Sequence, residues 1–214
     1  MSKVIWSQAD ASVATLVLGH GAGAPMDSPF MEQISGYLTN QSITVARFEF
    51  DYMAQRRTGG SKRPPPKAER LIASFAGILA EIGPQATTPI FIGGKSMSGR
   101  IAAMLAGDPE TAKSARGVVC LGYPLHPIGK PEQLRLDPLT KAGLPILICQ
   151  GDRDEFGNRA EFERVSLPQQ VEITWLEDGN HDFGPRGRSP ATKKGNLEQA
   201  ARSTRAFIDR VLAG

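Results

Sequence analysis

One serine lies where a predicted strand passes directly into a predicted helix. The segment PIFIGGKSMSGRIAAML places Ser96 in that turn, with Gly94 and Ser98 two residues to either side. A strand-to-helix turn of this kind holds its serine in a strained conformation that exposes the hydroxyl, and it needs small residues at both flanking positions. Ser98 is the weaker candidate, because its own flanking residues would be Ser96 and the bulky Arg100. The pattern therefore predicts that Ser96 is a nucleophile.

The same segment admits two other interpretations. Gly94, Lys95 and Ser96 could end a phosphate-binding loop, but that loop requires another glycine five residues before Gly94. Pro89 occupies that position, and residues 90–92 form an apolar, strand-like run. A tightly packed turn of small residues without any chemistry is the remaining alternative, and the turn alone does not exclude it.

A carboxylate and a histidine come later in the chain, each just after a predicted strand. Asp152 and Asp154 follow the apolar run 145–149, and His181 follows the run 171–175. An imidazole can remove the proton of a serine, and a carboxylate can hold the imidazole in the correct tautomer and stabilise its charged form. We expect Asp154 to be this carboxylate, with Asp152 as the alternative because it lies closer to the strand.

Other acidic and histidine residues near these strand ends are expected to have different roles. Asp178 and Asp182 are too close in sequence to His181 to orient it, so we expect them to stabilise turns or helix ends. His126 lies in the proline-rich segment YPLHP after another predicted strand. We expect His126 either to have a structural role or to contact the substrate.

A glycine-rich turn, GHGAGAP, follows the first strong strand. Acyl transfer needs backbone N–H groups aimed at the oxygen where negative charge develops, and glycines let the backbone approach that atom. We expect the N–H groups of Ala22 and of Met97, the residue after Ser96, to form this oxyanion hole, and Gly21 to contact the substrate. An ordinary glycine-rich turn is the alternative interpretation.

Alternating strands and helices must bring these residues together. The predicted strands are 15–18, 43–50, 90–92, 118–121, 146–149 and 171–175, and the predicted helices are 29–38, 68–82, 100–106 and 197–212. Continuous apolar runs are typical of strands that are buried on both faces, and the alternation indicates βαβ units. The sequence therefore predicts a doubly wound, mostly parallel α/β sheet with helices on both faces and functional residues beyond the carboxyl ends of the strands.

Length and composition limit the remaining possibilities. A chain of 214 residues with 40% hydrophobic content indicates a single domain over residues 1–214. The formal net charge of +3 is too small to indicate nucleic-acid binding, and no apolar run approaches the ~20 residues that cross a bilayer. We therefore expect a cytoplasmic, soluble protein with no nucleic-acid or membrane partner. The oligomeric state cannot be derived from the sequence.

Cysteines and basic residues give no sign of a cofactor. Cys120 and Cys149 lie inside apolar runs, so we expect reduced core thiols instead of a disulfide or a metal pair. No set of His, Cys and carboxylate residues has the spacing of metal ligands, and no cofactor is expected. The segment from Arg56 to Lys67, RRTGGSKRPPPK, is predicted to be an exposed, solvated loop, although it could also contact an anionic substrate.

Taken together, the motifs resemble a known family. The resemblance rests on six segments in this order: HGAGAP, RFEFDYM, GGKSMSGR, GYPLHPIGKPEQLR, QGDRDEFG and GNHDF. They span nearly the whole chain, which resembles the small, lidless α/β-hydrolase-fold proteins described as dienelactone-hydrolase-like. The resemblance implies a sheet of eight strands or slightly fewer, no separate lid domain, and a triad of Ser96, Asp154 and His181. Ser98 departs from the family, in which a glycine is more usual.

Two functions follow from this reading. The first is a serine hydrolase that cleaves an ester, thioester or related small acyl substrate through an acyl-enzyme on Ser96. The second is a non-catalytic interaction domain that binds a protein partner, because eukaryotic relatives of the resembled group include a subunit of the non-specific lethal chromatin complex. The short segments between the predicted strands indicate an open pocket, and the substrate itself cannot be predicted from them.

Overall fold

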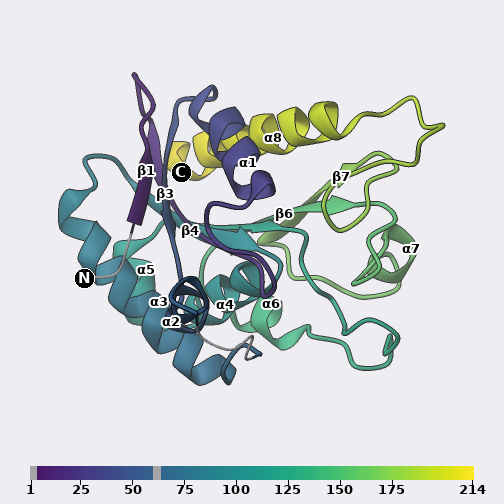
Figure 1. Ribbon diagram of the computed structural model, residues 1–214, viewed down its shortest axis with the longest axis horizontal. Coiled ribbons are helices and arrows are strands. Elements are labelled where there is room, and N and C mark those ends of the chain that lie inside the picture. The colour runs from purple at the N-terminus through teal and green to yellow at the C-terminus, as the bar shows by residue number, and fades with distance from the viewer. Residues whose placement is uncertain (1–3, 60–63) are drawn as a thin grey trace.

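A computed structural model describes residues 4–59 and 64–214 (Figure 1). Its centre is a sheet of seven strands, counted over these residues, in the order β1-β3-β2-β4-β5-β6-β7. The strands are β1 (Val4–Ser7), β2 (Ala14–Gly19), β3 (Ile43–Phe48), β4 (Ile90–Lys95), β5 (Val118–Leu121), β6 (Ile146–Gly151) and β7 (Val171–Leu176). The β1 strand runs antiparallel to β3, and the other neighbouring pairs are parallel. The predicted doubly wound, mostly parallel α/β sheet is confirmed.

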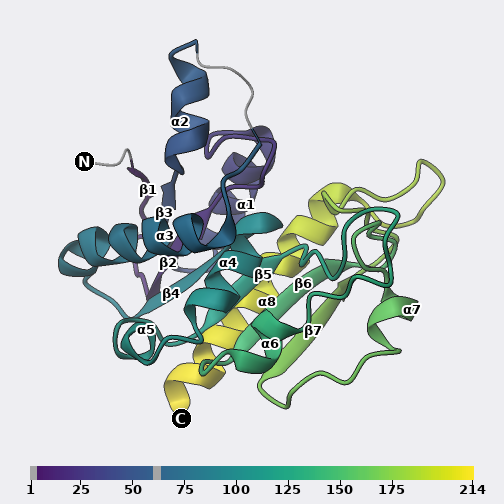
Figure 2. The same ribbon diagram turned by 90° about the horizontal axis from the view of Figure 1, so that it is seen from below.

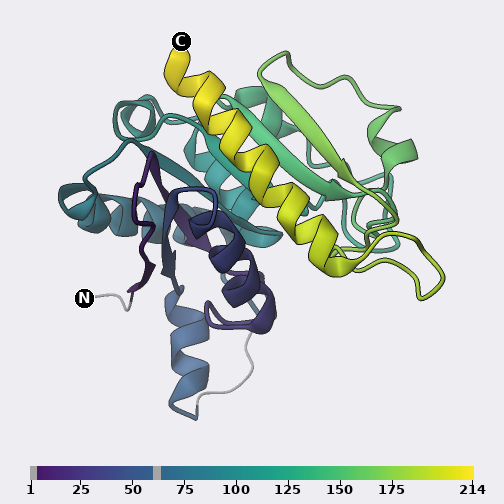
Figure 3. The same cartoon turned by 90° about the horizontal axis from the view of Figure 1, so that it is seen from above.

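Helices cover both faces of this sheet. They are α1 (Pro29–Thr39), α2 (Asp51–Arg57), α3 (Ala68–Ile82), α4 (Met97–Leu105), α5 (Pro109–Ser114), α6 (Asp137–Lys141), α7 (Arg159–Phe162) and α8 (Lys193–Ala213), with a 3₁₀ turn at Gly83–Gln85. Figure 2 shows α3, α4 and α6 on one face, and Figure 3 shows α1 and α8 on the other. Within the described ranges, no helix combines the length and apolarity needed to cross a membrane.

Side chains of the central strands pack into two cores, one on each face. Every residue of β2, β5 and β6 is buried, as expected for strands covered on both sides. Cys120 packs in the core under α4, whereas Cys149 packs in the core under α8. The two thiols are free and lie on opposite faces of the sheet, which excludes a disulfide between them. Burial raises the pKa of both thiols and keeps them protonated.

Several elements escape the sequence pattern because they are short or lie at an edge. The β1 strand was not predicted, and its four residues are only half-buried at the edge of the sheet. The prediction of an exposed loop from Arg56 to Lys67 is wrong at its start, because Arg56 and Arg57 form the last turn of α2. The Arg57 guanidinium bonds Glu49, with Nε 2.6 Å from Oε2, and also bonds Asp27. Lys62 and Arg63 of this segment lie outside the described residues.

Candidate active site

The carboxyl ends of the parallel strands meet at one edge of the sheet. In the strand register, Gly19 lies opposite Gly94, and Lys95 lies opposite Leu121. The chain runs from β2 to β3 on one side of β2 and then crosses over to β4 on the other side, so the strand order reverses between β2 and β4. Ligands of open α/β sheets bind outside the carboxyl ends at such a switch point. The residues after β2 and β4 are the glycine-rich turn and Ser96.

Ser96 occupies a strained turn between β4 and α4. Its φ of 52° and ψ of −110° are rarely adopted by residues other than glycine. The Ser96 N–H donates to the carbonyl oxygen of Leu121 at 3.0 Å, which fixes the turn against β5. A Cβ on Gly94 would collide with Ser98 Cβ and come within 2.7 Å of the Gly19 oxygen. The crowding explains the small residues that flank Ser96, which is itself partly exposed.

Ser98, the departure from the usual glycine, makes a specific contact. Its side chain is fully buried in the first turn of α4, and its hydroxyl donates to the carbonyl oxygen of His20. This hydrogen bond joins the helix that follows Ser96 to the glycine-rich turn after β2. A serine therefore fits the crowded position and ties the two turns together.

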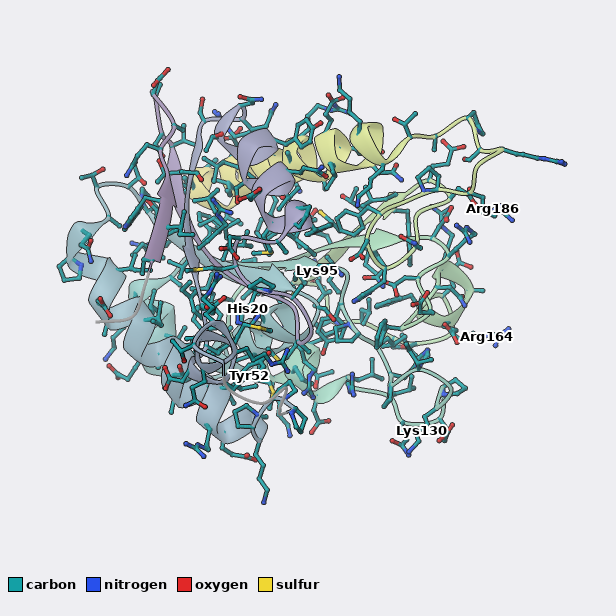
Figure 4. The ribbon with its side chains drawn as sticks, viewed as in Figure 1. His20, Tyr52, Lys95, Lys130, Arg164 and Arg186 are labelled. Carbon is teal, nitrogen blue, oxygen red and sulfur yellow. The ribbon has the colours of Figure 1, made fainter. Side chains whose placement is uncertain are left out.

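Two more side chains hold the next carbonyls of the glycine-rich turn. The Phe50 N–H donates to His20 Nε2 at 3.2 Å, so the His20 proton resides on Nδ1 and is donated to the Gly21 oxygen at 2.6 Å. Burial lowers the pKa of His20 and favours this neutral form. The Tyr52 hydroxyl donates to the Ala22 oxygen at 3.0 Å. Figure 4 shows His20 and Tyr52 near one another in the middle of the molecule.

These tethers restrict the direction of the backbone N–H groups. In a planar trans peptide the carbonyl and the N–H of the same unit point in opposite directions. The hydrogen bond from His20 to the Gly21 carbonyl therefore fixes the Ala22 N–H, which is the predicted oxyanion donor. Met97 supplies the other predicted donor and is the first residue of α4, where backbone N–H groups lack intrahelical partners.

Asp154 and His181 form a hydrogen-bonded pair beyond β6 and β7. His181 Nδ1 lies 2.8 Å from Asp154 Oδ2, and the Asp154 side chain is fully buried. Gln150 Nε2 donates to the same carboxylate oxygen at 3.0 Å, and the Phe156 N–H donates to Asp154 Oδ1 at 2.9 Å. Gln150 was not predicted, although a polar residue at the end of an apolar strand was a signal that could have drawn attention to it. The carboxylate is held from three directions and can orient an imidazole.

The His181 imidazole lies in a narrow space between two loops. The Phe156 ring lies 4.3 Å from the imidazole, measured between ring centroids. On the other side, a Cβ on Gly122 would lie only 3.3 Å from His181 Nδ1, and the φ of +71° at Gly122 also favours glycine. The His181 side chain is 17% exposed, so the imidazole has access to the surface. These contacts were not visible in the sequence, because they join segments far apart in the chain.

Ser96 and His181 both pack against the end of β5, and no direct hydrogen bond joins these two described residues. Ser96 donates its N–H to Leu121, and the next residue, Gly122, is packed against the imidazole. No hydrogen bond joins the Ser96 hydroxyl to another of the described residues. Contacts between a nucleophile and its base are often long without substrate and shorten when the substrate binds.

The other predicted site residues lie outside this arrangement. Asp152 is not the partner of His181, and Asp178 instead pairs with Arg153 and Arg186. His126 is buried, with Nε2 3.3 Å from Glu161 Oε1, which favours the structural role over a substrate contact. Among the residues that the structure describes, no cluster of three or more His, Cys, Asp or Glu side chains could hold a metal ion.

Solved structures of other proteins share this fold along nearly their whole length. The chain is 12% identical to Est1E from Butyrivibrio proteoclasticus, with a TM-score of 0.69, and covers 94% of that chain with 99% of its own. It is 17% identical to a dienelactone hydrolase from Anabaena variabilis, with a TM-score of 0.68 and coverage of 97% of this chain and 90% of that one. XC6422 from Xanthomonas campestris, a serine hydrolase without a lid, is also 17% identical, with a TM-score of 0.65 and coverage of 98% and 87%.

A sequence family gives the assignment. The profile of the family described as the alpha/beta hydrolase domain matches residues 12–209. This range includes six of the seven described strands, and only β1 lies before it. The match extends from just before β2 into α8 and contains the glycine-rich turn, Ser96, Asp154 and His181. The chain therefore belongs to the alpha/beta hydrolase domain family.

Proposed function

We propose that this protein is a serine hydrolase that cleaves an ester, thioester or related small acyl substrate. One observation carries the proposal: a serine with a strained, positive φ and a histidine whose Nδ1 bonds a fully buried carboxylate at 2.8 Å both pack against the end of β5, at Leu121 and Gly122. Strained backbone at a partly exposed serine and an oriented imidazole are features that cluster at sites of nucleophilic catalysis. In this proposal Ser96 is the nucleophile, His181 the general base and Asp154 the orienting acid.

The first half of the reaction forms an acyl-enzyme. Ser96 Oγ attacks the carbonyl carbon of the substrate while His181 Nε2 accepts the hydroxyl proton, and Asp154 stabilises the resulting imidazolium. The negative charge on the former carbonyl oxygen is stabilised by the N–H groups of Ala22 and Met97. The tetrahedral intermediate then collapses, the bond to the alcohol or thiol breaks, and the imidazolium gives its proton to this leaving group.

The second half restores the enzyme. His181 Nε2 removes a proton from a water molecule as the water oxygen attacks the acyl carbon on Ser96. The second tetrahedral intermediate uses the same N–H donors, and its collapse returns the proton to Ser96 Oγ and releases the carboxylic acid. Gly21, which has no side chain and lies beside these donors, is retained as a proposed substrate contact.

An acyl panel with matched serine variants tests the proposal. The panel contains nitrophenyl esters of graded chain length, a thioester and a lactone, and also a ferulate ester, because Est1E has been solved with ferulic acid bound. We expect hydrolysis of at least one compound and a loss of up to ~10⁶ in kcat for Ser96→Ala. Ser98→Ala is the control and is expected to lose at most about tenfold. Hydrolysis that survives Ser96→Ala unchanged would contradict the proposal.

Several predictions beyond the reaction stay open as proposals. A single domain over residues 1–214, a cytoplasmic location and the lack of a nucleic-acid partner remain predictions from the sequence. The relation to a subunit of the non-specific lethal chromatin complex is also a prediction. If a folded protein hydrolyses no member of the panel, the non-catalytic interaction domain becomes the better account.

A further inference from the structure

Lys95, the residue before the proposed nucleophile, is buried at the centre of the site. Its side chain is only 7% exposed, which is unusual for a lysine. Its Nζ donates to the backbone carbonyl oxygen of His181 at 2.8 Å and lies 3.3 Å from Asp182 Oδ1. The same Nζ lies 5.3 Å from the centroid of the Phe30 ring. A buried ammonium is costly unless it is paired, so these contacts must hold it in place.

The stem of Lys95 also passes close to the glycine-rich turn. A Cβ built on Gly21 would lie 3.5 Å from Lys95 Cγ, which is an ordinary van der Waals distance. The side chain therefore passes from β4, next to Ser96, along the turn that contains Ala22, and ends on the loop that contains His181. Figure 4 shows Lys95 in the middle of the molecule, far from the surface cations Lys130 and Arg186. One side chain therefore starts beside the nucleophile, passes near the turn of the oxyanion donors and bonds the loop of the base.

We infer that Lys95 is a positioning residue, whose charged amino group holds the His181 backbone so that the imidazole faces Ser96. The inference rests on the proposed function, and it adds a role that the triad does not contain. Asp154 fixes the rotation of the imidazole through Nδ1, whereas Lys95 fixes the backbone from which the imidazole projects. Because a displacement of about 1 Å at a reacting group can cost about 100-fold in rate, loss of this anchor reduces kcat more than it changes KM.

The titration of Lys95 provides a readout, the pH dependence of kcat, that a purely structural role would not change. Burial lowers the pKa of Lys95 to about 8, against the opposing effect of the carboxylates of Asp182, Asp154 and Glu155. The loop that Lys95 contacts carries two more titratable groups, the imidazole of His181 and the carboxylate of Asp182. Above pH 8 the amino group becomes neutral, and its hydrogen bond to the carbonyl loses its charge assistance. We expect kcat of the wild-type protein to fall in this range.

The fall in activity is not expected to come from unfolding. Since the pKa of Lys95 is lower in the folded protein than its ordinary value of 10.5, the unfolded chain binds more protons between pH 8 and 10.5. Because of this difference, Lys95 destabilises the folded protein less as the pH rises, and the free energy of unfolding increases. Activity and stability therefore change in opposite directions through this one group.

The experiment compares Lys95→Met, Lys95→Arg and Asp182→Asn in kinetics and in labelling by a fluorophosphonate. Lys95→Met keeps the apolar stem, and we expect its kcat to be about 10- to 100-fold lower than that of the wild-type protein, with KM within about twofold. The further decline of kcat above pH 8 should be absent from this variant. Lys95→Arg stays charged, so we expect partial recovery of kcat and no fall above pH 8. Asp182→Asn leaves the hydrogen bond from Lys95 to the His181 carbonyl in place. Because the Asp182 side chain is 62% exposed, loss of its charge is expected to lower kcat by at most about threefold.

The outcomes separate this inference from the proposed function. If the wild-type protein is folded but neither hydrolyses an ester nor reacts with the fluorophosphonate, the proposed function fails. If the wild-type protein reacts and Lys95→Met reacts at the same rate with the same pH profile, the positioning role of Lys95 is wrong. Circular dichroism and thermal unfolding of each variant identify a loss of fold. If Lys95→Met does not fold, the pH profile of Lys95→Arg against the wild-type protein decides the question.

Discussion

The two halves of the candidate site are held in different ways. On the β2 and β4 side, three consecutive backbone carbonyls of the glycine-rich turn each accept a hydrogen bond from a side chain: the donors are Ser98, His20 and Tyr52. On the β6 and β7 side, the parts that react are side chains, and Asp154 is fixed by Gln150 and the Phe156 N–H. The first half positions backbone N–H groups, and the second half positions an imidazole.

This difference predicts how each half responds to substitution. An imidazole that loses its orienting carboxylate adopts the wrong tautomer, and the chemistry itself is lost. A backbone turn that loses one of three tethers keeps the other two, so the N–H groups move only slightly. Substitutions in the acid and base half should therefore be severe, and substitutions among the tethers should be graded.

The largest effect is expected in the acid and base half. Asp154→Asn keeps the shape of the side chain but removes the charge that faces His181 Nδ1, and we expect kcat to fall by ~10⁴. Asp152→Asn is the matched control two residues away and should change kcat by less than about threefold. Steady-state kinetics on the best substrate of the panel measure both. Equal losses in the two variants would show that the assignment of the acid is wrong.

A tenfold effect is expected among the tethers. Tyr52→Phe removes only the hydroxyl that donates to the Ala22 oxygen, and a hydrogen bond of this kind contributes about 1 kcal/mol. We expect kcat to fall by up to about tenfold with little change in KM. Burial raises the pKa of Tyr52 to about 12, so the hydroxyl stays a donor across the working range and the loss should not depend on pH. A loss as large as that of Asp154→Asn would remove the distinction between the two halves.

A smaller effect should appear in stability at the nucleophile. The positive φ of Ser96 disfavours any residue with a Cβ, and glycine adopts this conformation without strain. Ser96→Gly and Ser96→Ala both remove the hydroxyl, but we expect the glycine variant to be more stable by about 1 kcal/mol. Urea unfolding of the two inactive variants measures the difference. A more stable alanine variant would argue against strain in the turn.

The smallest effect is expected at Asp178, which lies on the loop of His181 but pairs with Arg153 and Arg186 and not with the imidazole. Hydrogen bonds from Arg186 lower the pKa of the Asp178 carboxyl group to about 2, from an ordinary value of 3.8. This carboxylate therefore stabilises the fold above pH 3.8, and its contribution is lost as the pH falls toward 2. Asp178→Asn should lower the melting temperature slightly at neutral pH, flatten its decline in acid and leave kcat unchanged. A change in kcat would link these ion pairs to the site.

The sequence predicted the strands because their apolar runs are continuous, and it predicted Ser96 because the flanking small residues are close in the chain. Asp154 and His181 followed from their order after two strands. The supports could not be predicted, since Gln150, Tyr52 and Lys95 act through contacts between distant segments. The edge strand β1 and the helix α2 were missed because short, half-buried elements have little periodicity.

Covalent capture of Ser96 tests the central claim most directly. The folded protein is treated with a fluorophosphonate, which reacts only with an activated serine hydroxyl, and the modified peptide is identified by mass spectrometry. The account predicts one adduct, on Ser96, that is absent from Ser96→Ala and slowed by Asp154→Asn. An adduct on Ser98 or no adduct on a folded wild-type protein would contradict the account.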